Sequence, residues 1–322
     1  MYTIDALQKI FNEKLDDYTF PSQPSALYKP VEYILSLGGK RIRPVLVMAA
    51  YNLYKDDVEF AFEAGMSIEV FHNFSLLHDD IMDEAEMRRG QPTVHQLYDE
   101  NTAILSGDVM LIYAYRFLEK YPDKLVQLTK LFTDTSIEVC EGQRYDMDYE
   151  VTEEVSITEY LKMIELKTSV AIAASLSMGG ILANANAQDQ KHLYEFGRNM
   201  GIAFQIQDDL LDAFGSEESL GKKIGGDIRQ RKKTYLYLKS LELLSSIEAD
   251  ELRNIFLDLS GGETDMERVL ELYGSAHVDV HAHELKLVYQ QLAESHLQAV
   301  NVDQDRKSIL FEFSKKLLDR DV

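Results

Sequence analysis

The sequence has little that would interrupt a helix after its first third. All six prolines lie within the first 122 residues, and the remaining 200 contain none. Alternating β-branched runs joined by Asn-Gly or Asp-Gly turns are also missing, so we expect no sheet. A proline-free stretch of this length suits long, uninterrupted helices. The sequence therefore predicts an all-α fold.

Cysteines and long apolar runs are also scarce. The one cysteine, Cys140, excludes an intrachain disulfide, fits a reducing compartment and is expected to be a buried structural thiol. No apolar run approaches the roughly 20 residues that span a bilayer. The N-terminal residues lack the basic start and apolar stretch of a signal peptide. We therefore expect a cytoplasmic protein without an integral membrane segment.

Positive charge is in short supply. The chain carries 33 Lys and Arg against 55 Asp and Glu, a net charge of −22. This balance argues against general binding to nucleic acid or to anionic membranes, because both need a basic surface. A polyanionic ligand would have to be held by metal ions or by local clusters of bases.

The length and the apolar pattern indicate a large helical protein. The 322 residues are 45% hydrophobic, enough for a sizeable core. A three-to-four-residue apolar period runs through residues 62–82, 156–183, 187–213 and 284–300. Breaks containing glycine separate the segments. We expect a single domain over residues 1–322, built as one large bundle of roughly a dozen helices around a central cavity.

Two D-D-x-x-D motifs, at 79–83 and 208–212, carry the clearest chemical signal. Positions i, i+1 and i+4 share one face of a helix, so each motif presents three carboxylates together. Such carboxylates repel one another unless a cation lies among them. A solvated helix face would explain one such motif equally well, but both are embedded in apolar sequence. Carboxylates joined by substrate phosphates are typical Mg²⁺ ligands, and we expect both motifs to line one cavity.

Bases lie close to these motifs. Lys40 and Arg43 follow Gly38-Gly39, whose backbone can approach a ligand closely. An ammonium and a planar guanidinium both suit phosphate oxygens. The alternative is a solvated helix start here, and a solvated helix end at 88–90. Further bases stand at Lys167, Lys222, Lys223, Lys232 and Lys233.

The order and spacing of five motifs resemble those of the all-trans polyprenyl diphosphate synthases. They are G-G-K-R-x-R-P from Gly38, the first D-D-x-x-D with R-R-G behind it, G-Q-x-x-D from Gly142, the pair Lys167-Thr168, and F-Q-x-x-D-D-x-x-D from Phe204. The resemblance covers residues 38–234. It implies the isoprenoid synthase fold, a homodimer, and head-to-tail condensation of isopentenyl diphosphate with an allylic diphosphate.

The resemblance also implies a role for each group of residues. Magnesium, as three ions with substrate bound, would be held by Asp79, Asp83 and Asp208, with Asp80, Asp209 and Asp212 as weaker or water-mediated ligands. The allylic diphosphate would bind Arg88, Lys167, Thr168, Gln205, Lys222 and Lys232. Of these, Lys167, Thr168 and Gln205 would stabilise the allylic cation. Isopentenyl diphosphate would bind Lys40, Arg43, His72 and Arg89. Gln143 and Asp146 would be supporting hydrogen-bond partners.

Product length is expected to depend on side chains one or two turns before Asp79. Phe74 and the deeper Phe71 would form the floor of the product tunnel, while Ser75 is small and leaves space. Within the family, this combination without an insertion in the motif is similar to archaeal-type geranylgeranyl synthases. We therefore expect a C20 product, geranylgeranyl diphosphate, with C15 farnesyl diphosphate as the alternative.

Other classes of protein fit the motifs less well. A class I terpene cyclase would not need Lys40, Arg43 and Arg89, and a non-catalytic subunit of a heteromeric synthase would tend to lose aspartates. A plain helical scaffold would not require ordered motifs. The histidines His277, His281 and His283 superficially resemble a metal site. We expect them in a helix connection and assign them no chemistry.

Overall fold

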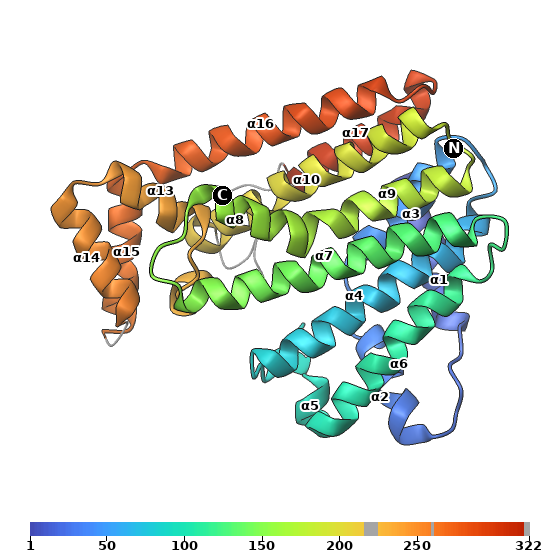
Figure 1. Ribbon diagram of the computed structural model, residues 1–322, viewed down its shortest axis with the longest axis horizontal. Helices are drawn as coiled ribbons and strands as arrows, with labels where there is room; N and C mark the ends of the chain where they lie inside the picture. Colours follow the sequence, from blue (N-terminus) through green and yellow to red (C-terminus); the bar gives the residue numbers. More distant parts are fainter. Residues whose placement is uncertain (216–224, 259–260, 319–322) are drawn as a thin grey trace. The chain divides into compact units, whose positions relative to one another are not determined.

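The computed structural model describes residues 1–215, 225–258 and 261–318. Its regular structure is helical apart from one short hairpin, which confirms the predicted all-α class (Figure 1). The chain forms two compact units. The first contains Met1–Thr133, Ala174–Leu193 and Asn301–Ile309; the second contains Asp134–Ala173, Tyr194–Val300 and Leu310–Val322. Whether they form one domain, as the sequence suggests, stays a prediction.

The first unit is built on helix α4 (Phe62–Met82), which carries the first aspartate motif at its C-terminal end. Its remaining elements are α1 (Ile4–Asp17), α2 (Ser25–Ser36), α3 (Ile42–Asn52), η1 (Val58–Ala61), β1 (Met87–Arg88), β2 (Gln91–Pro92), α5 (Val94–Leu97), α6 (Glu100–Leu118), and parts of α7 (Leu125–Val151), α9 (Val170–Leu182), α10 (Ala187–Phe214) and α17 (Gln304–Leu318).

Helix α4 packs against α3 and α6, and small residues let the helices approach. A Cβ at Gly107 of α6 would collide with the His78 ring, and one at Gly65 would touch Pro44 of α3. Buried apolar side chains on α4, including Ile68 and Leu77, fill the contact. This packing fixes the end of α4, and with it the first aspartate motif.

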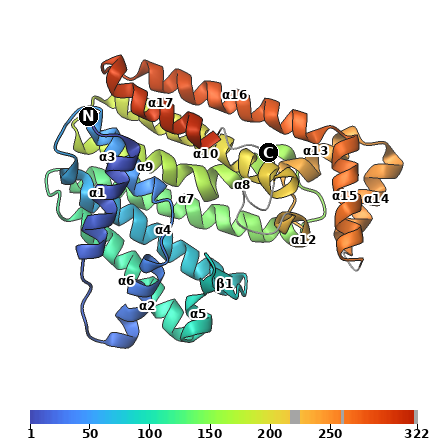
Figure 2. The same cartoon turned by 180° about the vertical axis from the view of Figure 1, so that it is seen from behind.

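The expectation that the chain has no sheet is wrong at one place. Strand β1 pairs antiparallel with β2 across Arg89 and Gly90, which have φ angles of 52° and 76° (Figure 2). Two successive positive φ angles define the tight turn that matches strand twist. An Arg-Gly pair is not among the usual signals for this turn. Strands of two residues are also too short to show an alternation of apolar and polar side chains. Arg88 and Arg89 therefore lie in a hairpin, not on a helix end.

The second unit contains α8 (Ile157–Ile164), a π-helical turn η2 (Glu165–Ser169), α12 (Gly226–Arg229), α13 (Tyr235–Leu243), α14 (Ser246–Leu257), α15 (Glu263–Ser275), α16 (Val278–Ala299), and the rest of α7, α9, α10 and α17. Helix α13 packs against α14, α15 and α16 (Figure 1). Apolar residues of α10, such as Ile206 and Leu210, join this core. They lie beside the second aspartate motif and hold it in place.

Two smaller expectations are also corrected. The side chain of Cys140 is exposed on α7, while its neighbour Val139 faces inward. His281 and His283 lie within α16, and His277 is its N-cap. Val278 and Ala282 repeat at four residues on the buried face, so the helix begins earlier than the apolar period suggested. In the described part of the chain, no helix is long and apolar enough to cross a membrane.

Candidate active site

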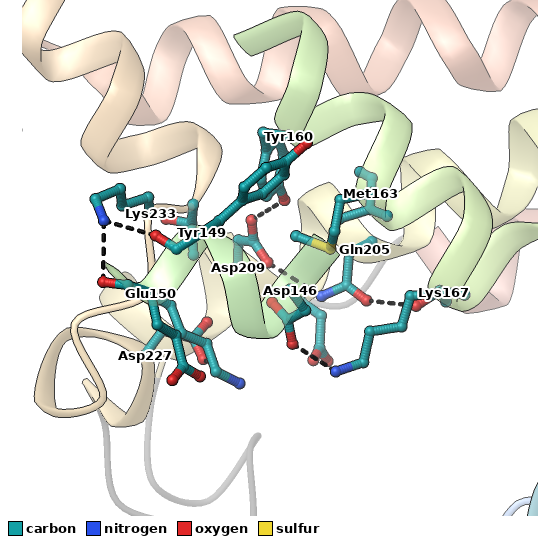
Figure 3. Close-up of a pocket in the computed structure, with 15 residues that line it drawn as sticks. Asp146, Tyr149, Glu150, Tyr160, Met163, Lys167, Gln205, Asp209, Asp227 and Lys233 are labelled. Carbon is teal, nitrogen blue, oxygen red and sulfur yellow. Dashed lines mark hydrogen bonds and ion pairs between the residues drawn. The ribbon is translucent and has the colours of Figure 1, made fainter. Parts of the chain in front are cut away.

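The second unit encloses a cavity of about 240 Å³ beside the second aspartate motif (Figure 3). Its walls come from the end of α7, from α8 and the π-helical turn, from α10, and from α12 and the segment after it. The lining residues are Asp146, Tyr149, Glu150, Tyr160, Met163, Ile164, Lys167, Thr168, Gln205, Asp208, Asp209, Asp227, Lys232, Lys233 and Thr234. Seven residues given a role from the sequence thus meet here: Asp146, Lys167, Thr168, Gln205, Asp208, Asp209 and Lys232.

Lys167 and Thr168 lie in the π-helical turn, where the sequence suggested continuous α-helix. Two glycines let other helices pack against its backbone. A Cβ at Gly142 of α7 would lie 2.7 Å from the Lys167 Cα, and one at Gly201 of α10 would lie 2.6 Å from the Ser169 Cα. Wide turns of this kind are rare and concentrate at functional sites. The glycine of G-Q-x-x-D therefore has a packing role that the motif alone does not reveal.

The last residue of the G-Q-x-x-D motif contacts the π-helical turn directly. The Lys167 Nζ lies 2.5 Å from a carboxylate oxygen of Asp146, and both side chains are largely shielded from solvent. This ion pair fixes the ammonium group at the cavity wall (Figure 3). The Gln143 Oε1 is buried and has no hydrogen-bond partner among the described residues.

A chain of hydrogen bonds runs through the cavity wall. The Thr168 hydroxyl donates to Gln205 Oε1 over 3.3 Å, and Gln205 Nε2 donates to Asp209 Oδ1 over 3.1 Å. The Tyr160 hydroxyl donates to the other Asp209 oxygen (Figure 3). Burial, followed by the charge of Asp227, raises the pKa of Asp209 well above its usual range. Burial also raises the pKa of Tyr160, so its hydroxyl stays protonated.

The three aspartates of the second motif have different surroundings. Asp208 lines the cavity, and its carboxylate has no hydrogen-bond partner in the described part of the chain. Asp209 accepts the two hydrogen bonds above. Asp212 is buried and accepts one from the Asp227 backbone N–H over 2.8 Å. Asp208 is thus the member best exposed to a ligand in the cavity.

Helix α12 and the segment after it supply one residue that the sequence did not single out and one that it named without a role. Asp227 lines the cavity and lies 3.8 Å from the Lys232 Nζ. Lys233 donates to the carbonyls of Tyr149 and Glu150, over 2.6 and 3.2 Å, and so caps the end of α7. The run Gly225-Gly226-Asp227 was the available signal. Lys222, predicted to bind the allylic diphosphate, and Lys223 lie outside the described residues.

In the first unit, the first aspartate motif is linked to the hairpin. Arg88 Nε donates to both oxygens of the buried Asp80, each over 2.8 Å. Asp79 is half-buried, and Asp83, the C-cap of α4, is exposed. As in the second motif, a buried aspartate is bound by protein groups while others face outward.

The first unit also contains a basic cavity of about 480 Å³. All four residues predicted to bind isopentenyl diphosphate line it: Lys40, Arg43, His72 and Arg89. Arg41 and Glu69, which the sequence reading did not assign, form a buried ion pair in the same wall. Arg41 has a φ of 47°, and its guanidinium also donates to the Leu35 carbonyl, so it ties the turn before α3 to α2 and α4.

Glycine is required where this turn meets the hairpin. Gly39 has a φ of 128°, and a Cβ there would lie 2.8 Å from the Arg89 guanidinium. Arg89 itself donates to the Gly38 carbonyl. The paired glycines of the motif therefore allow the arginine to reach the cavity.

The basic cavity is strongly electropositive. Burial, with Arg89 nearby, lowers the pKa of Arg43 to about 10, which leaves the guanidinium charged at neutral pH. Burial and then the Arg43 charge lower the pKa of His72 well below its usual value, so its ring is neutral. Arg43 Nη1 lies 3.2 Å from His72 Nε2, and Arg43 Nε has no hydrogen-bond partner among the described residues. This cavity can hold an anion without a metal.

The three residues predicted to set product length lie on α4. Phe74 packs on the His78 ring at 4.7 Å and on Phe71 at 5.9 Å. Phe71 is buried against Phe132, which in turn packs on Tyr115 at 4.7 Å. Ser75 donates to the His72 carbonyl over 2.9 Å. Phe132 and Tyr115, on α7 and α6, therefore support the aromatic pair from behind.

Within the described residues, no three histidine, cysteine or acidic side chains cluster closely enough to hold a metal ion by themselves. The α16 histidines therefore form no such cluster, although His281 lies 3.6 Å from Glu284. The donor chemistry of the aspartate motifs nevertheless fits a hard cation. Carboxylate oxygens of Asp83 and Asp208 are open to a ligand, and Mg²⁺ usually completes its shell with water and substrate phosphate.

Comparisons with known proteins agree on one family. A model of the polyprenyl synthetase family matches residues 24–273. A short chain isoprenyl diphosphate synthase of Methanocaldococcus jannaschii is 37% identical over 84% of this chain and 83% of its own. A geranylgeranyl pyrophosphate synthase of Geoglobus acetivorans is 36% identical over 97% of both chains. A crystal structure of a geranylgeranyl pyrophosphate synthase covers both chains fully, with a TM-score of 0.95 and 43% identity.

Proposed function

Because the chain belongs to the polyprenyl synthetase family, we propose that it joins isopentenyl diphosphate head-to-tail to an allylic diphosphate and releases inorganic diphosphate. The observation that carries this proposal is the basic cavity around Arg43, which gathers four bases and a neutral histidine. A cyclase needs one diphosphate site, whereas a condensing enzyme needs a second one that works without metal. The proposal places isopentenyl diphosphate on Lys40, Arg43, His72 and Arg89.

We propose the accessible aspartates Asp79, Asp83 and Asp208 as Mg²⁺ ligands. The protein-bound carboxylates Asp80, Asp209 and Asp212 would act through water or as weaker ligands, because their oxygens already accept hydrogen bonds. Three bound ions would neutralise charge on the allylic diphosphate as its C–O bond breaks. Arg88, Lys167, Lys222 and Lys232 would complete the site for that diphosphate.

The residues in the second unit's cavity would then stabilise the allylic cation. The Thr168 hydroxyl, the Gln205 amide oxygen and the Lys167 carbonyl provide oxygen dipoles held in place before the reaction. The Lys167 ammonium, fixed by Asp146, would stay beside the departing diphosphate. That diphosphate is also the proposed acceptor for the proton lost after condensation.

We propose geranylgeranyl diphosphate, C20, as the product. The aromatic pair Phe74 and Phe71 is supported from behind by Phe132, which suits a firm floor. The relatives described above include synthases named for this product. A homodimer, a cytoplasmic location and a single domain over 1–322 remain predictions from the sequence.

The proposed reaction is tested by diphosphate release from purified protein given Mg²⁺, isopentenyl diphosphate and an allylic diphosphate. We expect release that depends on both substrates and stops when EDTA removes the metal. Asp79→Ala should abolish it, whereas Asp279→Ala, at an exposed position of α16 outside the motifs, should not. Release without isopentenyl diphosphate would favour a cyclase, and absence of release would overturn the synthase assignment.

A further inference from the structure

Tyr160 is a buried residue of the second unit's cavity to which the motifs give no role. It is 2% exposed, and its hydroxyl donates to Asp209, which is 4% exposed. Asp209 in turn accepts from Gln205, and Gln205 accepts from Thr168. A continuous chain of hydrogen bonds therefore leads from Tyr160 to the proposed cation-stabilising hydroxyl.

The orientation of the Gln205 amide sets the direction of the hydrogen bonds in this chain. Its NH₂ group donates to Asp209, and its oxygen faces Thr168. An amide oxygen only accepts, so the Thr168 hydroxyl must donate its single proton to Gln205. Both lone pairs of the Thr168 oxygen are then left for the cavity, where a positive charge would develop.

The π-helical turn explains why Tyr160 and Thr168 reach the same wall. Eight residues of regular α-helix would rotate Thr168 about 80° away from Tyr160. One extra residue in the turn between them reduces the offset to about 20°. Gln205 and Asp209, four residues apart on α10, face this wall together.

We propose that Tyr160 is a positioning residue for the condensation: through Asp209 and Gln205 it orients the Thr168 hydroxyl so that its lone pairs face the allylic cation. The inference rests on the proposed function and adds a residue to it. Tyr160 contacts neither substrate nor metal in this scheme. Its hydroxyl supplies the second donor that fixes the orientation of the Asp209 carboxyl group.

The test compares Tyr160→Phe with Tyr235→Phe, a tyrosine of the same buried core that does not line the cavity and is 6% exposed. We expect Tyr160→Phe to lower kcat about tenfold, less than the 100-fold typical of losing a direct donor, with KM for both substrates within about twofold. Tyr235→Phe should keep kcat within about twofold of the wild type. Equal kcat values for the two variants would overturn the proposal.

A double-mutant cycle separates positioning from simple structural support. Because Tyr160 acts through Thr168, adding Tyr160→Phe to Thr168→Val should lower kcat by less than about twofold further. A further tenfold loss would show that Tyr160 acts independently and would overturn the proposal. If Tyr160→Phe does not fold, Asp209→Asn takes its place in the same cycle. The NH₂ group of an asparagine can make the Gln205 amide rotate, so that its oxygen no longer faces Thr168. A role of Asp209 in metal binding alone would make that cycle additive.

An assay of the wild-type protein separates a failure of the proposed function from a failure of the inference on Tyr160. If it releases no diphosphate from the mixed substrates, the proposed function fails and the role of Tyr160 fails with it. If it does, but Tyr160→Phe behaves like the control or the cycle is additive, only the inference on Tyr160 fails.

Discussion

The clearest test of the site's architecture is Gly142→Ala. A Cβ at this position would overlap the Lys167 backbone nitrogen and lie 2.7 Å from both the Leu166 carbonyl carbon and the Lys167 Cα, although ordinary contact begins at 3.4 Å. The backbone of α7 and the π-helical turn must therefore separate by at least about 0.7 Å, since a backbone cannot rotate aside as a side chain can. Overpacking of this kind costs about 1–3 kcal/mol of stability.

The same change should also slow catalysis. The shift moves Lys167 and Thr168 away from the cavity and strains the 2.5 Å ion pair with Asp146. Misplacement of a catalytic group by about 1 Å reduces the rate about 100-fold, so we expect kcat to fall about 30- to 100-fold, equivalent to about 2–2.7 kcal/mol.

Gly274→Ala provides the matched control for Gly142→Ala. It lies in helix α15 of the same unit, and a Cβ there would meet nothing within 4 Å. That variant should be neutral or more stable by about 0.4–1 kcal/mol, with unchanged kcat. Steady-state kinetics with both substrates and thermal unfolding of each variant provide the measurements. A Gly142→Ala enzyme with kcat like that of Gly274→Ala would refute the proposed packing of the turn.

Three further predictions concern the first unit. Arg43→Ala should raise KM for isopentenyl diphosphate by roughly 10- to 150-fold, because a hydrogen bond to a charged group contributes about 1.5–3 kcal/mol. Steady-state kinetics measure this, and an effect confined to the allylic substrate would show that the two sites are exchanged. His72→Gln should flatten the dependence of unfolding free energy on pH. Because the folded-state pKa of His72 lies below its unfolded value of about 6.5, the unfolded chain takes up a proton first, and His72 lowers stability as pH falls below 6.5, by up to about 1.4 kcal/mol per pH unit. Denaturant titrations between pH 7 and 5 measure this, and parallel curves for the two proteins would contradict it. Phe74→Ala should lengthen the product, as measured by chromatography of the dephosphorylated alcohols, and an unchanged product would remove Phe74 as the floor.

The helices that could be predicted are those whose signal lies within their own sequence. The apolar period over 62–82 matches α4, and the period over 187–213 matches α10 to within one residue at its end. In both helices, burial of one face repeats at three to four residues whatever packs on it. The four residues predicted to bind isopentenyl diphosphate also line one cavity, as the order and spacing of their motifs led us to expect.

The features that could not be predicted depend on contacts between distant segments. The π-helical turn at 165–169 exists where Gly142 and Gly201 let two other helices approach it, and neither lies nearby in sequence. The roles of Asp227 and Lys233 likewise depend on Asp212 and on the end of α7. Tyr160 carried no signal at all, because a tyrosine on an apolar helix face looks like core.

Product analysis with farnesyl diphosphate is the most direct test of the proposed activity and product. The purified protein is incubated with Mg²⁺, isopentenyl diphosphate and farnesyl diphosphate, and the chain lengths of the products are measured. We expect a clean C20 product. Failure to extend farnesyl diphosphate, with C15 accumulating from dimethylallyl diphosphate, would contradict the assigned product and its Phe74 floor, and no condensation from either substrate would contradict the synthase itself.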